Sequence, residues 1–209
     1  MNSSDAPKHP LFTIGHSNLD AEAFLDLLRR NKIQVVADVR SSPYSHYTPQ
    51  FNRETLQAAL KHAGIDYVFL GDELGARRSE REVYENGQAA YERIAQTPSF
   101  KSGLERVLSG AKKFRVTLMC AEKDPLTCHR AILVCRNLKI FGADIQHIHT
   151  DGHLETHASA EQRLLQTLKL PTEDFFRSPS EILGEAYAIQ GKKIAYAEEV
   201  EGKEISPAV

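Results

Sequence analysis

Short apolar runs alternate with polar clusters along the first part of the chain. Four of these runs are expected to be strands: Leu11–Ile14, Ile33–Val39, Ile65–Leu70 and Val116–Met119. The second run is rich in Val and Ile and nearly continuous, which is typical of parallel strands covered on both faces. Each run ends in a group of polar residues, so the pattern predicts strands with polar loops at their carboxyl ends.

Stretches with helical periodicity separate the apolar runs. Asp20 is expected to cap a helix that carries Phe24, Leu27 and Leu28 on one face. Further helices are expected from Asn52 or Thr55 to near Gly64, from Ser79 to Gln96, from Phe100 to Leu108 and from about Cys128 to Leu138.

The alternation of strand and helix predicts an α/β fold, with an open, mostly parallel sheet and helices on both faces. Asp144–His149 alternates in polarity, and we expect a fifth strand there, near an edge of the sheet. Residues 1–158 are expected to form this α/β domain. Right-handed crossovers would place the carboxyl ends of the strands on one side, so the polar clusters should face one crevice.

Residues 159–209 are expected to form a C-terminal extension packed on the same domain. A first amphipathic helix is predicted over Ser159–Leu170. Ser178 and Glu181 fit a capping box with a proline between them, which predicts a second helix over Pro179–Gln190. That helix is expected to end at Gly191 and to be followed by a short strand or packing arm at Lys193–Tyr196.

Composition limits the classes of function. The 209 residues include 26 basic and 28 acidic side chains, so the formal net charge is 26 − 28 = −2. Nucleic acid as a partner is therefore not supported by a global basic field. No apolar run is long enough to span a bilayer and no signal peptide is evident, so we expect a cytoplasmic protein without a membrane partner. Its three cysteines are expected to be reduced.

The stretch Cys120–Arg130 concentrates the candidate chemistry in one strand-to-helix connection. Cys128 beside His129 and Arg130 is a candidate nucleophile with a lowered pKa, and Cys120 is a weaker one. The alternative is that both thiols are small buried hydrophobic groups, as is expected for Cys135. Glu122 is a candidate acid or base, with a structural carboxylate as its alternative.

Metal ligation is the second interpretation of this stretch. Cys120, Cys128, His129 and the distant His16 would give four ligands, but their spacing is irregular and does not resemble a structural zinc motif. We therefore expect no metal and no other cofactor. A second set, His147, His149, His153 and His157, is interpreted as polar side chains on the exposed face of an edge strand.

Three of the polar clusters contain an arginine, and this favours an anionic ligand. Asp38 and Arg40 share a sheet face, where Asp38 is a candidate base and Arg40 an anion clamp, unless the two form a structural ion pair. Arg77 and Arg130 would converge on the same crevice. Arg130 is expected either to bind the anion and stabilise the Cys128 thiolate or to pair with Asp38 or Glu122.

Several of these segments together resemble one family, the domain of unknown function 488 proteins. The matching segments are Thr13–Ser17, Ala37–Pro43, Gly64–Tyr67, Leu70–Gly75, Met119–Lys123, Cys128–Arg130, Asp151–Gly152, His157 and Ala188–Tyr196. The resemblance implies a small cytosolic α/β protein. It also implies that His16, Ser17 and His157 belong to the candidate ligand site. His46 and Ala76 depart from the pattern, which has an arginine and a glycine there. The resemblance therefore indicates where a site lies, but it does not indicate which reaction takes place there.

Two classes of function fit these observations. The first is an enzyme, a hydrolase or a transferase, that acts on a phosphate-bearing nucleotide or nucleic-acid substrate through Cys120, Glu122, Cys128 and Asp38. The second is a non-catalytic module that binds a small anionic, nucleotide-like ligand or nucleic acid. No Gly-x-Gly-x-x-Gly or Walker-type loop is present, which argues against ordinary dinucleotide or triphosphate binding.

Overall fold

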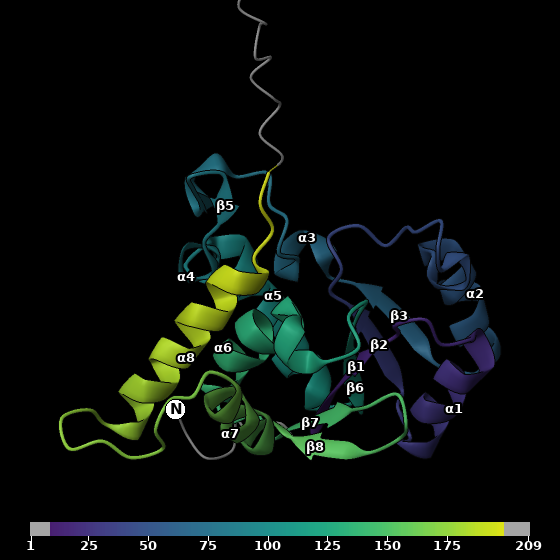
Figure 1. Ribbon diagram of the computed structural model, residues 1–209. Coiled ribbons are helices and arrows are strands. Elements are labelled where there is room, and N and C mark those ends of the chain that lie inside the picture. The colour runs from purple at the N-terminus through teal and green to yellow at the C-terminus, as the bar shows by residue number, and fades with distance from the viewer. Residues whose placement is uncertain (1–8, 199–209) are drawn as a thin grey trace, which may run out of the picture.

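The computed structural model describes residues 9–198 and is an α/β fold built on one six-stranded sheet (Figure 1). The strand order is β3-β2-β6-β1-β7-β8, and every pair is parallel except β7–β8. The strands are β1 (Leu11–Gly15), β2 (Val35–Asp38), β3 (Asp66–Phe69), β6 (Val116–Cys120), β7 (Ile145–Ile148) and β8 (Leu154–Thr156). The predicted fold class is confirmed.

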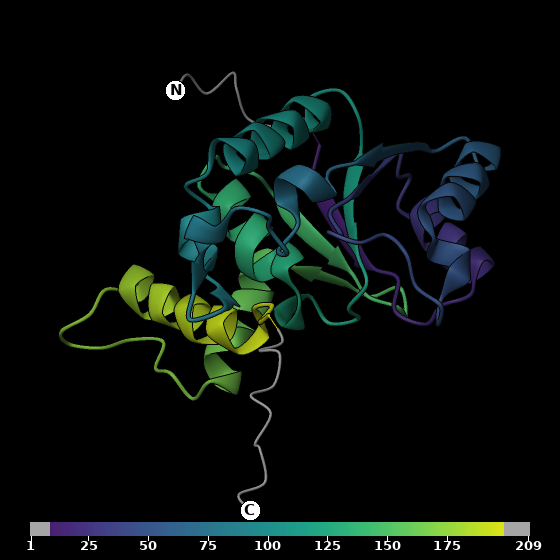
Figure 2. The ribbon, with the colours of Figure 1, turned by 90° about the horizontal axis from the view of Figure 1, so that it is seen from above.

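Helices cover both faces of the sheet (Figures 1 and 2). One face packs against α1 (Ala21–Arg30) and α2 (Arg53–His62). The other packs against α5 (Pro98–Ala111), the π-helical segment η4 (Arg130–Cys135), α6 (Arg136–Lys139) and α8 (Pro179–Ile194). The remaining helical segments are η1 (Pro49–Phe51), α3 (Gly71–Leu74), η2 (Arg81–Val83), α4 (Tyr91–Ile94), η3 (Pro125–Thr127) and α7 (His157–Thr167).

Local sequence signals account for the positions of several elements. All residues of β1, β2 and β6 are buried, as expected for central parallel strands whose two faces are both covered. The Asp20 side chain accepts a hydrogen bond from the Ala23 amide and caps α1. Ser178 and Glu181 form the predicted capping box of α8.

The segment between Ser79 and Gln96 is not the predicted helix. It contains a two-stranded hairpin, β4 (Tyr84–Glu85) and β5 (Gln88–Ala89), followed by the single turn of α4. Asn86 and Gly87 connect the two strands with φ angles of 52° and 77°. An Asn-Gly pair is the strongest short signal for such a turn, and it outweighs the weak helical pattern around it.

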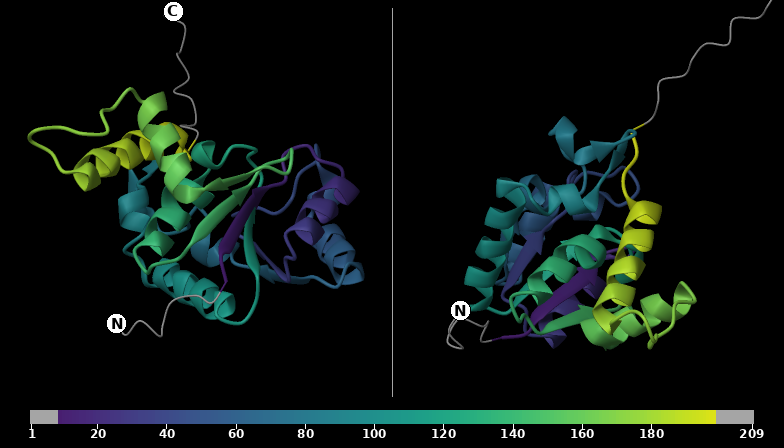
Figure 3. Two further views of the ribbon diagram at one scale, coloured as in Figure 1. Left: turned by 90° about the horizontal axis from the view of Figure 1, so that it is seen from below. Right: turned by 90° about the vertical axis from the view of Figure 1, so that its left-hand side faces the viewer.

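The C-terminal extension differs from the prediction at one point. Helix α8 continues through Gly191 to Ile194, because Gly191 is buried against Tyr91 and Ile132 and does not terminate the helix. The arm that follows pairs with the hairpin through an isolated bridge between Gln88 and Ala197. Figure 3 shows this end of α8 beside the hairpin. Residues 199–209 of the predicted extension lie outside the described residues.

The strand predicted near an edge of the sheet is β7, which lies next to the edge strand β8 and pairs with it in antiparallel orientation. His147 on β7 is fully buried, in contrast to the exposed position expected for it. Within residues 9–198 no helix is both long and apolar enough to cross a bilayer.

Candidate functional site

The carboxyl ends of β1, β2, β3 and β6 lie on the same side of the sheet, as predicted, because all four strands are parallel neighbours. A pocket of about 320 Å³ opens at this edge. It is lined by residues from the loops after β2, α3 and β6 and by the end of α8: Arg40, Ser41, Ser42, Tyr44, Ala76, Arg77, Tyr91, Cys120, Ala121, Glu122, Thr127, His129, Ile194 and Tyr196.

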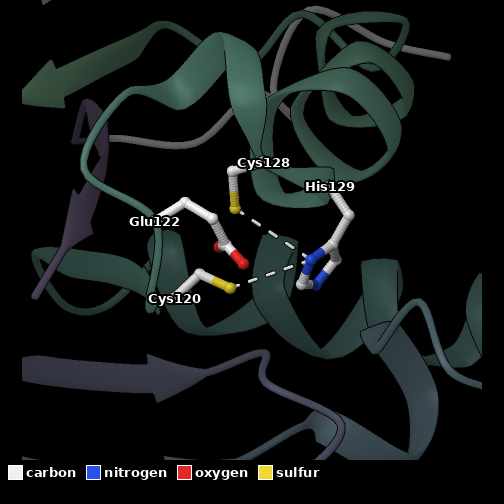
Figure 4. A group of neighbouring side chains, drawn as sticks. All are labelled: Cys120, Glu122, Cys128 and His129. Atoms are coloured by element: carbon white, nitrogen blue, oxygen red, sulfur yellow. Dashed lines mark hydrogen bonds between the residues drawn. The ribbon is translucent and has the colours of Figure 1, made fainter. Parts of the chain in front are cut away.

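Four side chains of the Cys120–Arg130 stretch lie close together (Figure 4), and three of them, Cys120, Glu122 and His129, line the floor of this pocket. Cys120 is the last residue of β6, and Cys128 and His129 lie between η3 and η4. The Nδ1 atom of His129 is 3.7 Å from Cys120 Sγ and 4.0 Å from Cys128 Sγ. With a Glu122 carboxylate oxygen, the donor atoms of the four side chains all lie within 4.8 Å of one another. We call this group the Cys-His-Glu cluster.

The two thiols of the cluster differ in acidity. Burial disfavours the thiolate of Cys128, but the hydrogen bond from Cys120 and the charge on Arg130 hold the pKa of Cys128 well below that of a free thiol. Burial, and then the hydrogen bond and charge of Cys128, raise the pKa of Cys120. The pair therefore favours one thiolate at Cys128 and one thiol at Cys120.

Glu122 approaches the two thiols from the pocket side. The residue is exposed, but Figure 4 shows its carboxylate pointing toward the sulfur atoms. The desolvation of this carboxylate, together with the negative charge on Cys128, raises the pKa of Glu122. A carboxyl group with a raised pKa is better suited to donate and accept protons than an ordinary exposed carboxylate.

Arg130 is buried away from the pocket and does not take the predicted ligand-binding position. The residue is 1 % exposed. Its guanidinium donates to the carbonyl oxygens of Glu122, at 2.7 Å, and Lys123, at 3.2 Å. It is not paired with the Asp38 or Glu122 carboxylates either. The backbone N–H of Arg130 points to Cys128 Sγ at 3.4 Å instead of into the crevice. Arg130 thus fixes the loop and supports the thiolate.

Asp38 and Arg40 form the structural ion pair that was one of the two interpretations. Asp38 is fully buried, and its oxygens accept bonds from the backbone N–H, Nε and Nη2 of Arg40 and from the Tyr67 hydroxyl. No carboxylate oxygen is left to act as a base. Arg40 is 6 % exposed and still contributes to the pocket wall.

His16 lies behind the pocket wall and serves as a neutral partner of Arg40. Its Nδ1 donates to the Ser17 carbonyl at 2.9 Å, and its Nε2 accepts from Arg40 Nη1 at 3.2 Å. Burial lowers the pKa of His16 to about 4, so the ring is uncharged at neutral pH. His16 and Ser17 are both absent from the pocket lining, although both were expected in the ligand site.

Arg77 is the cation that the pocket presents to solvent. Its guanidinium lies 4.6 Å above the ring of Tyr196, and its backbone N–H donates to Ser41 Oγ at 2.9 Å. No carboxylate of residues 9–198 pairs with this guanidinium. Ala76, the second departure from the family pattern, is buried beside Arg77 at the pocket wall, whereas His46 is exposed.

His157 belongs to a different network, between β7, α7 and α8. Thr13 Oγ1, His147, His157, the Tyr187 hydroxyl and Glu161 form a chain with distances of 2.7, 2.9, 3.0 and 2.9 Å. Because Tyr187 donates to Glu161, the chain has one direction: each group donates to the next, and both imidazoles are neutral. His157 therefore connects β7 to α8 and does not line the pocket.

Sequence reasoning missed part of the pocket wall. Ser41 and Ser42 follow β2 and appear in the polar cluster there, but they were not selected. Tyr91 and Tyr196 reach the pocket from the hairpin region and from the arm after α8. The position of Tyr196 within the terminal matching segment was the available signal, whereas nothing local distinguishes Tyr91 from a core tyrosine.

The spacing of the cysteine and histidine residues along the chain predicts no metal site, but spacing does not determine which side chains the fold brings together. Three of the four residues considered, Cys120, Cys128 and His129, are brought together despite their irregular spacing. The fourth, His16, stays outside the cluster, and Glu122 takes its place. The donor set is therefore two sulfurs, one imidazole nitrogen and one carboxylate, a combination that zinc sites use.

The fold and the site define an open α/β protein whose polar pocket lies at the carboxyl ends of its parallel strands. The family model for "Domain of unknown function DUF488" matches residues 20–136, just over half of the chain. The chain belongs to this family. No curated protein and no solved structure matches it.

Proposed function

We propose that this protein is an enzyme, a hydrolase or a transferase, that acts on a small phosphate-bearing substrate bound in the pocket. The observation that supports this most is the position of Arg77. It is a guanidinium without a carboxylate partner among the described residues, set at the wall of a pocket whose floor is the Cys-His-Glu cluster. An unpaired, accessible guanidinium is the group that proteins use to bind phosphate and carboxylate oxygens.

Hydroxyl groups complete the anion site. Ser41 and Ser42 line the pocket beside Arg77, whereas the Tyr44 hydroxyl at the same wall already donates to Glu54. Arg40 adds a second guanidinium, although its charge is largely offset by Asp38. Within residues 9–198, a bound phosphate would thus meet one guanidinium without a carboxylate partner and the hydroxyl groups of the two serines. Such a set holds a single phosphate group better than an extended polyanion.

Catalysis is assigned to the floor of the pocket. Glu122 has a raised pKa and reaches both the pocket and the two thiols, so it can transfer a proton to or from a bound substrate. A binding module without catalysis would use the Arg77 side of the pocket alone. The two functions differ in what Glu122 does and agree on what Arg77 does.

Anion binding by matched variants tests the proposal. We expect inorganic phosphate, and more strongly a nucleoside monophosphate, to bind the full chain in isothermal titration calorimetry. Arg77→Ala should weaken this binding by about tenfold to a hundredfold, since a charge-assisted bond contributes roughly 1.5–3 kcal/mol. Arg29→Ala is the control, because Arg29 is an exposed arginine on α1 that pairs with Glu22 and Asp26.

Hydrolysis of chromogenic phosphate monoesters and diesters then separates the enzyme from the binding module. Glu122→Gln should abolish turnover while Arg77→Ala mainly raises KM. Equal phosphate affinities in Arg77→Ala and the wild type would contradict the proposed site. Arg77-dependent binding without turnover of any ester would favour the binding module.

A further inference from the structure

We propose that the Cys-His-Glu cluster is a metal site, in which Cys120, Cys128 and His129 hold one divalent transition-metal ion of the zinc class and Glu122 is a replaceable fourth ligand. The inference rests on the proposed function only in that both place the reacting groups at this end of the pocket. Its evidence is the arrangement of the donor atoms and of the groups around them.

The separations of the donors suit a tetrahedral ion. With Zn–S near 2.3 Å and Zn–N near 2.0–2.1 Å, tetrahedral ligand atoms lie about 3.5–3.8 Å apart. The two sulfur-to-Nδ1 distances are 3.7 and 4.0 Å, and the donors of all four side chains lie within 4.8 Å of one another. Small side-chain rotations would bring all four onto one centre.

His129 is held in the tautomer that a metal ligand needs. Its Nε2 lies 2.9 Å from the carbonyl oxygen of Val39, and because a carbonyl only accepts, Nε2 carries the proton. In the neutral ring the lone pair is therefore on Nδ1, the atom that faces both sulfurs. A ligating histidine characteristically donates its other N–H to a carbonyl or carboxylate in this way.

The groups around Cys128 favour its thiolate form and hold the sulfur in a fixed position. Its sulfur accepts the backbone N–H of Arg130 at 3.4 Å, and the Arg130 guanidinium holds the loop through the Glu122 and Lys123 carbonyls. Two thiols and a carboxylate in contact repel one another when ionised. A divalent cation between them removes that repulsion, because it adds positive charge to the cluster.

The position of Cys128 favours a ligand over a nucleophile. Cys128 is 1 % exposed and does not line the pocket, so its sulfur is out of reach of a bound substrate. Glu122 and His129 lie on the pocket side of the cluster. A metal held by the two sulfurs and Nδ1 would thus turn its Glu122 position toward the pocket, where a phosphate oxygen or a water could replace the carboxylate.

Metal titration of the full, untagged chain tests the inference. The protein is stripped with a chelator, kept reduced and titrated with Zn²⁺ in the presence of a competing chelator. We expect one tightly bound Zn²⁺ per chain. Co²⁺ in place of Zn²⁺ should give the visible bands of a tetrahedral ion together with sulfur-to-metal charge-transfer absorption. Both measurements use the wild-type protein, so they do not depend on any variant folding.

Single substitutions then identify the ligands. Cys120→Ser and Cys128→Ser should each weaken Zn²⁺ binding by at least a hundredfold, and Glu122→Gln by tenfold or less. Cys135→Ser is the matched control, because Cys135 is equally buried but outside the cluster, and it should bind Zn²⁺ like the wild type.

Three results would overturn the inference: no stoichiometric Zn²⁺, an octahedral Co²⁺ spectrum without charge transfer from sulfur, or Zn²⁺ affinity unchanged in both cluster cysteine variants. Phosphate titration with and without Zn²⁺ keeps the two proposals apart. Arg77-dependent phosphate binding without any Zn²⁺ binding would refute the metal site alone. Zn²⁺ binding without phosphate binding would refute only the proposed substrate.

Discussion

The imidazole of His129 donates from Nε2 to the carbonyl oxygen of Val39 over 2.9 Å, although 90 residues separate the two along the chain. Val39 follows β2, and His129 is the last residue of the segment that leads from β6 into η4. β2 and β6 are adjacent parallel strands, so their carboxyl ends present this carbonyl to this ring. The bond fixes which nitrogen of His129 faces the two thiols.

Two substitutions of His129 should separate its two roles. In His129→Gln the side-chain amide N–H replaces Nε2 and still donates to Val39, but the lone pair at Nδ1 is lost. We expect Zn²⁺ binding to be lost in both His129→Gln and His129→Ala. Only His129→Ala leaves the buried carbonyl unpaired, so its free energy of unfolding should be lower by a further 1–3 kcal/mol, roughly. Urea denaturation and Zn²⁺ titration of the two variants measure this. Equal stability of the two would contradict it.

Breaking the buried ion pair between Asp38 and Arg40 should destabilise the fold strongly. Arg40→Ala leaves a fully buried carboxylate without its main partner, and we expect the free energy of unfolding to fall by about 3–5 kcal/mol. Tyr67→Phe removes one further donor to Asp38 and should cost about 1 kcal/mol. Arg29→Ala, at an exposed ion pair, should leave the free energy of unfolding almost unchanged. A cost for Arg40→Ala as small as that of Arg29→Ala would show that the pair is not structural.

Gly15 is expected to tolerate no side chain. A Cβ there would lie 1.8 Å from the Glu122 carbonyl oxygen, a backbone atom that Arg130 already holds. Gly15→Ala must displace the loop that carries Glu122, and we expect it to lower the free energy of unfolding by about 3 kcal/mol. Gly184→Ala is the matched control: nothing lies within 4 Å of its Cβ in α8, and the change should stabilise the helix by about 0.5–1 kcal/mol. Thermal unfolding of the two variants should shift in opposite directions.

The two histidines between β7 and α8 should make stability depend on pH. Burial lowers the pKa of His157 to about 4 and holds that of His147 well below its usual value. The groups facing His157 are His147, Tyr187, Glu161, Lys139 and Glu155.

The sign follows from proton linkage. Between pH 6.5 and about 4 the unfolded chain binds protons that the folded chain excludes, so stability is fully present above pH 6.5 and is lost as the pH falls. His157 alone should account for a loss of about 2 kcal/mol between pH 7 and pH 5. Urea denaturation at the two pH values should show a smaller loss in His157→Gln than in the wild type. The same loss in both proteins would show that His157 is protonated in the native state.

The sequence by itself determined the elements and the edge of the sheet at which the site lies. Continuous apolar runs marked β1, β2, β3 and β6, and capping residues such as Asp20 and Ser178 marked helix starts, because these signals act between residues that are close in the chain. Since parallel strands share one carboxyl edge, the polar residues after each run were correctly expected on one side. The Asn86–Gly87 turn was equally local and was overlooked.

Only the tertiary structure decided which of those polar residues meet. The strand order places Val39 beside His129 and buries His147 between Thr13 and His157, and no local pattern encodes that order. Arg130 donates to backbone carbonyls, Asp38 is paired with Arg40, and Arg77 has no carboxylate partner within residues 9–198. The same side-chain types in another strand order would have different partners. Their chemistry depends on partners, burial and charge, which the fold sets through contacts between distant parts of the chain.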